Sequence, residues 1–151
     1  MRLKWLFCMN AQREYVFFTD RDLGKQFPEI LRNAGIHVER HIDHFADDAK
    51  DEDWLEEISK RGWYVLTHDR KMRYRTNEIN AIAQFKIGVF VIVGKISFPQ
   101  LAQNFVHTFR QITNFIDKNS RPFIAKIYSA DQKKIKGKLQ PPGYIKMWVS
   151  F

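Results

Sequence analysis

Short apolar runs alternate along the chain with stretches whose apolar residues recur at helical spacing. The short runs predict five strands, at residues 14–19, 36–42, 63–67, 89–93 and 123–128. The helical patterns between them predict helices at residues 23–34, 51–61, 77–86 and 97–117. This alternation predicts a three-layer α/β/α domain with a mostly parallel central sheet, in which residues 123–128 lie at an edge.

The helical patterns also predict which side chains are buried. Three apolar residues after Asp51 give a narrow stripe: Trp54, Leu55 and Ile58. In the next helix the inward side is expected to contain Ile79, Ile82, Ala83 and Phe85. The longest pattern has one continuous apolar side formed by Phe98, Leu101, Phe105, Phe109, Ile112 and Ile116. It is therefore expected to be a single helix against the sheet.

A length of 151 residues fits one domain, and we expect residues 1–151 to form it. The single cysteine, Cys8, excludes an intramolecular disulfide and favours the cytoplasm. No apolar run approaches the roughly 18 residues of a membrane span, and residues 1–9 lack a secretory cleavage site. We therefore expect a soluble protein without a membrane partner.

Two of the predicted strands end in aspartate. Asp20 follows the run Val16 to Thr19, and Asp69 follows Val65 to His68. Ligands of open parallel sheets bind outside the carboxyl ends of the strands, where the strand order reverses. The two carboxylates are therefore expected at the same edge.

Further acids are expected to approach this edge from first helical turns, where Asp51, Glu52 and Glu78 lie. Carboxylate oxygens are hard ligands and suit Mg²⁺ or Mn²⁺ better than zinc. Such a cation can activate a water molecule and neutralise charge during phosphodiester hydrolysis. An acidic cluster in a protein of net charge +8 is better explained by a bound cation than by stability.

The positive charge lies mostly in the second half of the chain, where Asp117 and Asp131 are the only acids after residue 78. This surplus suits either an anionic partner such as RNA or a solvated face. A basic loop directly follows Asp69, and its cations are candidate RNA contacts: Arg70, Lys71, Arg73 and Arg75. Tyr74, inside this loop, is a candidate for base stacking, and a mobile solvent loop is the alternative.

Four stretches carry a resemblance to a known family: Phe17 to Gly24, Asp51 to Leu55, Gly62 to Asp69 and Gly88 to Val91. In this order and spacing they resemble the PIN-like domains of VapC-type toxins, especially the VapC45-like group. The resemblance covers about residues 15–128, which leaves residues 1–13 and 129–151 as extensions.

The resemblance implies a Mg²⁺-dependent endoribonuclease that is the toxin of a toxin–antitoxin pair, with a protein antitoxin and a homodimer as partners. Asp20, Asp51 and Asp69 take the family's ligand positions. Where the family commonly has a further acid or polar residue, this chain has Arg70 and Lys71. The fourth acid is therefore open among Glu78, Asp22 and Glu52.

Other interpretations of these residues stay open. Asp20 could cap the following helix, and the first-turn acids could be stabilised by helix dipoles alone. The protein could be a catalytically silent nucleic-acid-binding module. It could also be a phosphatase-like hydrolase that uses Asp20 as a nucleophile with Asp22 two residues later.

Overall fold

The computed structural model describes residues 15–71, 75–130 and 141–151. Its sheet has six strands in the order β2-β1-β3-β4-β5-β6. Their bounds are β1 Phe17–Thr19, β2 Val38–Arg40, β3 Tyr64–Thr67, β4 Gly88–Ile92, β5 Phe123–Tyr128 and β6 Tyr144–Ser150. Strands β1 to β5 are parallel, and β6 pairs antiparallel with β5, so the sheet is mostly parallel as predicted.

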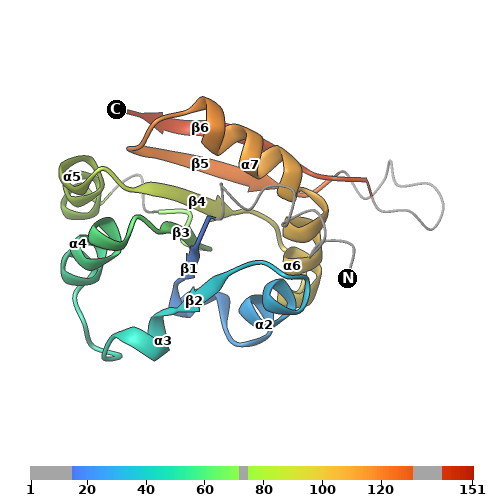
Figure 1. The fold of residues 1–151 in the computed structure, drawn as a ribbon, viewed down its shortest axis with the longest axis horizontal. Coiled ribbons are helices and arrows are strands. Elements are labelled where there is room, and N and C mark those ends of the chain that lie inside the picture. Colours follow the sequence, from blue (N-terminus) through green and yellow to red (C-terminus); the bar gives the residue numbers. More distant parts are fainter. Residues whose placement is uncertain (1–14, 72–74, 131–140) are drawn as a thin grey trace.

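Helices cover both faces of this sheet (Figure 1). The α2, α6 and α7 helices pack on one face, and α4 and α5 pack on the other. The bounds are η2 Arg21–Leu23, α2 Gln26–Asn33, α3 His41–His44, α4 Asp51–Arg61, α5 Thr76–Phe85, α6 Phe98–His107 and α7 Phe109–Lys118. The predicted three-layer α/β/α architecture is confirmed.

Successive side chains of a strand point to opposite faces, and each face has its own core. Phe17 packs with the residues of α2 and α6, whereas Phe18 packs with Trp54 and other residues of α4. Both phenylalanines are fully buried. This explains why β1 has no polar alternation before it ends at Thr19.

The strand order reverses at β1, which lies between β2 and β3. The connection from β1 to β2 contains α2 on one face, and the connection from β2 to β3 contains α4 on the other. Loops diverge above and below the sheet at such a point, which leaves a crevice beyond the carboxyl ends of β1 and β3. Asp20 and Asp69 follow these two strands.

Two predictions about strands were wrong. The run expected at residues 36–42 is a strand only at Val38–Arg40, because His41–His44 turns into the short helix α3. Residues 123–128 form a strand as predicted, but not at an edge, because β6 pairs along their whole length. The edge strand on this side of the sheet is β6, in a segment that we expected to be an extension.

The helix predicted at 97–117 is two helices that meet at Thr108. The buried Thr108 hydroxyl accepts a hydrogen bond from the Gly143 N–H at 2.8 Å. A bend at Thr108 lets α6 pack against α2 while α7 reaches β6 (Figure 1).

The predicted burial also needs two corrections. Phe98, at the first position of α6, is exposed, and its ring contacts that of His68. Ala83 is exposed as well, while Glu78 and Ala81 are buried on the inner side of α5. No helix in the described part of the chain is long and apolar enough to cross a membrane.

Candidate active site

Asp20 lies where β1 ends, and the sheet itself holds its backbone. Its N–H donates to the Leu66 carbonyl of β3 at 3.0 Å. Its carboxylate accepts a hydrogen bond from the Arg21 N–H at 2.7 Å and caps the short helix η2. Burial raises the pKa of Asp20, and the negative charge of Asp51 adds to this effect. Asp20 is therefore both a capping residue and a partly buried acid with another acid nearby.

Thr67, the last residue of β3, connects the acids of the two strands. Its Oγ1 lies 3.0 Å from Asp22 Oδ2 and 3.4 Å from Asp20 Oδ2. The same oxygen accepts a hydrogen bond from the Asp69 N–H at 3.2 Å. The carboxylates of Asp20 and Asp22 thus share one buried hydroxyl group, which Asp69 contacts through its backbone N–H. The three residues lie at the same edge of the sheet, as the sequence predicted for Asp20 and Asp69.

Asp22 is held more firmly than its place in an exposed turn suggests. Besides Thr67, the N–H of His68 donates to Asp22 Oδ2, at 3.1 Å. Loss of water around the carboxyl group and the charge of Asp20 raise the pKa of Asp22 to about 6, although both hydrogen bonds act in the opposite direction. Asp22 is therefore a supporting acid directly beside Asp20.

Asp51 and Glu78 lie in the first turns of α4 and α5, which pack side by side. Both line a hollow of about 580 Å³, together with Glu52 and Arg75. The Trp54 indole N–H donates to Asp51 Oδ1 at 3.0 Å and orients that carboxylate.

Glu78 is only 6% exposed. Burial and the neighbouring Asp51 carboxylate raise its pKa to about 7, although Arg75 acts in the opposite direction. Its Oε2 atom has no hydrogen-bond partner among the described residues. Such an orphaned, buried carboxylate oxygen is unusual and suits a cation ligand.

Arg75, the residue before α5, contacts two of the predicted site acids. Its Nη1 atom donates to Asp69 Oδ2 and, at 3.2 Å, to Glu78 Oε1. Arg75 was predicted as an RNA contact, but in this structure its guanidinium group faces the acids.

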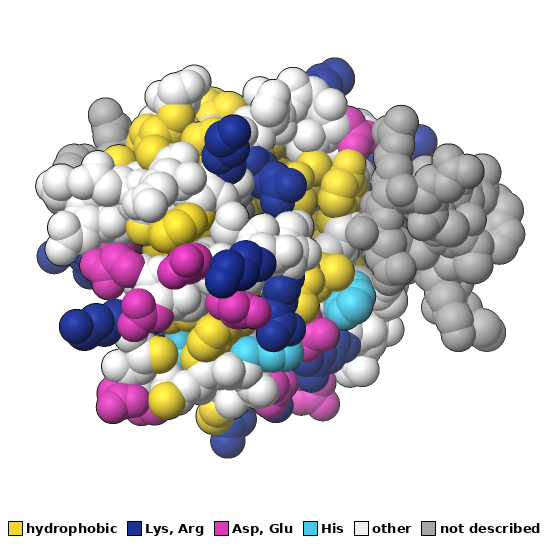
Figure 2. Space-filling model, turned by 60° about the vertical axis from the view of Figure 1, so that its left-hand side comes forward, with side chains coloured by type: hydrophobic (Ala, Val, Ile, Leu, Met, Phe, Trp, Pro, Cys, Tyr) yellow, Lys and Arg dark blue, Asp and Glu magenta, His cyan; other side chains and the backbone are white. Residues whose placement is uncertain are grey.

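The rest of the basic loop is exposed in the part that the structure describes. Arg70 and Lys71 are exposed, and the Lys71 N–H donates to Asp69 Oδ1 at 2.9 Å. Arg73 and Tyr74 lie outside the described residues. In Figure 2, which turns the side of α4 and α5 forward, acidic and basic side chains are interspersed on the surface.

Asp20 lines a second hollow, of about 490 Å³, together with Lys25, Arg40 and His41. His41 is 1% exposed, and neither ring nitrogen has a hydrogen-bond partner among the described residues. The burial of His41 was not predicted, because it lies in the expected strand 36–42, whose other polar residues are exposed or half-buried.

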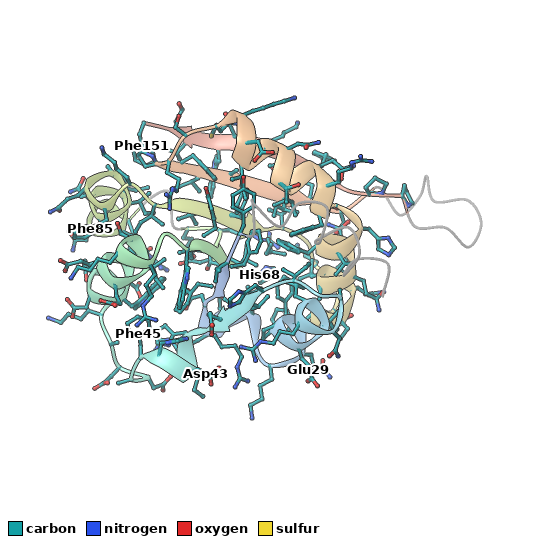
Figure 3. All side chains as sticks on the ribbon, viewed as in Figure 1. Glu29, Asp43, Phe45, His68, Phe85 and Phe151 are labelled. Carbon is teal, nitrogen blue, oxygen red and sulfur yellow. The ribbon has the colours of Figure 1, made fainter. Side chains whose placement is uncertain are left out.

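Two further histidines contact a carboxylate and a backbone carbonyl. His44 Nε2 lies 3.1 Å from Glu39 Oε2, and His68 Nδ1 lies 2.7 Å from the Ile92 carbonyl. His68 lies near the middle of Figure 3, well apart from Phe151, which follows β6. Among residues 15–71, 75–130 and 141–151, no three acidic, histidine or cysteine side chains converge closely enough to hold a metal ion as they stand. The donor set nevertheless fits a hard cation, because it consists of carboxylates and includes the orphaned Glu78 oxygen.

A comparison with known protein families identifies the family of this chain. The family model described as "PIN like domain" matches residues 15–94, which contain β1 to β4 and the acids named above. The chain belongs to the PIN-like domain family. The PIN-like domain is a nuclease-type fold, and such domains typically bind divalent metals. A search of curated proteins and of solved structures finds no match.

Proposed function

We propose that this PIN-like domain is a metal-dependent endoribonuclease. The observation that carries the proposal is the buried Glu78 Oε2 atom, which has no hydrogen-bond partner among the described residues and lines the same hollow as Asp51. Burial and the charge of Asp51 also raise the pKa of Asp20 and of Glu78. Carboxylates that raise one another's pKa are destabilising unless a cation lies among them. PIN-like domains typically bind divalent metals, and such a cation would neutralise these carboxylates.

Asp20, Asp51 and Asp69 would hold the Mg²⁺ or Mn²⁺ ion, with Glu78 as the fourth acid. When bound, the cation supplies an activated water molecule and relieves charge on the phosphate group. Thr67 keeps Asp20 and Asp22 in place through its hydroxyl group. The Trp54 indole does the same for Asp51.

The basic loop would bind the phosphates that flank the cleaved bond. Arg70 and Lys71 are exposed directly after Asp69, and we assign the same role to Arg73. Contacts of this kind position a nucleic acid and carry no sequence preference by themselves. The RNA substrate is therefore expected to be selected elsewhere on the surface.

Cleavage of a fluorescent single-stranded RNA by purified protein tests this proposal. We expect cleavage with Mg²⁺ or Mn²⁺, none with EDTA, and loss of cleavage in Asp20→Asn and Asp69→Asn. Asp53→Asn is the matched control, because Asp53 is an exposed acid in the first turn of α4. If the two site variants cleave RNA as fast as the Asp53 variant, the assignment is wrong.

A second candidate function is a catalytically silent module that binds nucleic acid. The ion pairs of Arg75 with Asp69 and Glu78 favour this second candidate, because the guanidinium group already neutralises these acids without a metal ion. This candidate predicts RNA binding that neither EDTA nor the Asn substitutions change. The cleavage assay and an RNA-binding assay on the same variants separate the two.

The finer biological role that we propose is that of a VapC-type toxin of the VapC45-like group, inhibited by a protein antitoxin. The support is the sequence resemblance, and we extend to this chain the homodimer that the resemblance implies. We expect a neighbouring reading frame to encode a small DNA-binding protein. This protein should co-purify with the chain and block cleavage. Light scattering of the purified protein measures the dimer.

A further inference from the structure

We propose that Arg75 neutralises the carboxylates of Asp69 and Glu78 in the metal-free protein, and that a divalent cation must displace it from them. Arg75 would then be a positioning residue that sets the cation affinity of the site. The inference rests on the proposed function, because it takes these carboxylates to be cation ligands.

The contacts of Arg75 identify the groups for which it competes. A single guanidinium nitrogen, Nη1, contacts both Asp69 Oδ2 and Glu78 Oε1. The two carboxylates come from different elements, the loop after β3 and the first turn of α5. One nitrogen that bridges two such carboxylates stands in the place of a shared cation.

Burial explains why a positive charge is needed here. The Glu78 side chain is only 8% exposed, and that of Asp69 is 20% exposed. A buried carboxylate without a compensating charge is strongly unfavourable. Arg75 supplies this compensation while no divalent cation is bound.

The exposure of Arg75 explains how it can leave. Its side chain is 49% exposed, so water can replace the lost contacts at small cost. A divalent cation near Asp69 and Glu78 would repel the guanidinium group and bind the carboxylate oxygens that this group now contacts. The released group would lie beside Lys71 and Arg70, where a planar guanidinium can bind an RNA phosphate through two hydrogen bonds.

The test measures Mn²⁺ binding to the full chain by electron paramagnetic resonance, with Arg75→Gln, Arg75→Lys and Arg61→Gln. We expect Arg75→Gln to bind Mn²⁺ about three- to tenfold more tightly than the unchanged protein, which corresponds to the loss of the two partly exposed ion pairs of Arg75. Arg75→Lys keeps the charge and should stay within about twofold. Arg61 is about as exposed as Arg75 and pairs with the more exposed Glu57 elsewhere on α4, so Arg61→Gln should leave Mn²⁺ binding unchanged.

A merely structural role of Arg75 would weaken Mn²⁺ binding, so unchanged or weaker binding by Arg75→Gln overturns the inference. If Arg75→Gln does not fold, the unchanged protein supplies the answer by nuclear magnetic resonance. Mg²⁺ should then shift the Nε–H signal of Arg75, assigned with Arg75→Lys, and leave that of Arg61 in place. An unshifted Arg75 signal at saturating Mg²⁺ overturns the inference as well.

These results separate the inference from the proposed nuclease. If the unchanged protein cleaves RNA but Arg75→Gln binds Mn²⁺ no more tightly, only the inference fails. If the unchanged protein neither cleaves RNA nor binds Mn²⁺, while Arg75→Gln binds it, the inference stands and the nuclease proposal fails. If no variant binds Mn²⁺, both fail.

Discussion

The hydroxyl group of Thr67 lies 3.0 Å from Asp22 Oδ2 and is the shortest side-chain link between β3 and the acids that follow β1. A hydroxyl group has a single proton, so Thr67 donates to Asp22 or to Asp20 at any moment, while its lone pairs accept from Asp69. The acids of both strands therefore depend on one side chain that is not itself charged.

Replacing this hydroxyl is the first test. Thr67→Val keeps the shape but removes one of the two hydrogen bonds to Asp22 and leaves the Asp69 N–H without this acceptor, which should lower the free energy of unfolding by about 1–2 kcal/mol. The Thr67 hydrogen bond lowers the pKa of Asp22, so its loss should raise that pKa above about 6. Carbon-detected titration of the carboxyl groups measures the pKa, and thermal melting measures the stability. Thr67→Ser keeps the hydroxyl and should leave both nearly unchanged.

The stability of the metal-free protein should depend on pH through Glu78. Its pKa rises from 4.5 to about 7 on folding, so the folded protein binds this proton more tightly than the unfolded chain. The contribution of Glu78 to the free energy of unfolding is fully present below pH 4.5. It is lost as the pH rises through 7, which lowers the free energy of unfolding by up to about 3 kcal/mol. Asp20 and Asp22, whose pKa values are also raised, act in the same direction.

Chemical denaturation between pH 4.5 and 8.5 measures this effect. Glu78→Gln should flatten the profile and stabilise the metal-free protein at pH 8. Glu56→Gln, an exposed acid on α4, should retain the profile of the unchanged protein. A profile that rises toward pH 8 in the presence of EDTA would contradict the environment that we describe for Glu78.

Trp54 should report cation binding directly. Its indole N–H bonds to Asp51, and the side chain is fully buried. Mn²⁺ is paramagnetic, so its binding at Asp51 should quench part of the tryptophan fluorescence. Trp54→Phe should abolish most of this quenching and weaken Mn²⁺ binding, whereas Trp148→Phe on β6 should preserve both. Equal quenching in the two variants would place the cation away from Asp51.

Gly143 should tolerate no side chain. A Cβ atom there would lie 1.8 Å from the Tyr128 carbonyl oxygen and 2.9 Å from Asn104 Oδ1. Gly143→Ala must therefore displace the start of β6 and should cost about 1–3 kcal/mol or more. Urea denaturation measures the loss.

The control for this substitution is Gly62→Ala. Among the described residues, a Cβ atom at Gly62 would meet only Arg121, at 3.9 Å, but the φ angle is +69°. The cost there should be only about 1 kcal/mol, because it reflects left-handed backbone alone. A smaller loss for Gly143→Ala than for Gly62→Ala would contradict the contacts around Gly143.

The sequence predicted well those elements whose pattern reflects local burial. The run at 123–128 became β5 with the same bounds, and the helix that opens at Asp51 ends before Gly62 as expected. By contrast, β6 was missed because its side chains are mostly exposed or half-buried. Its position is decided by pairing with β5, a long-range contact that leaves little local signal.

The candidate site shows the same limit. That Asp20 and Asp69 lie at one edge followed from strand order, because parallel strands bring their carboxyl ends together. The roles of Thr67 and Trp54 did not follow, since an ordinary strand threonine and a core tryptophan give no sign of a bond to an acid. Nor did the break at Thr108, because the apolar spacing continues through it without interruption.

The pairing of β6 with β5 has a consequence for any shortened form of this chain. β5 places fully buried side chains in both cores, and β6 pairs with it from Phe123 to Tyr128. The family match ends at residue 94, before either strand, but the sheet that positions the acids continues into both. A chain cut back to the matched residues would therefore leave β4 unpaired along the side that β5 occupies.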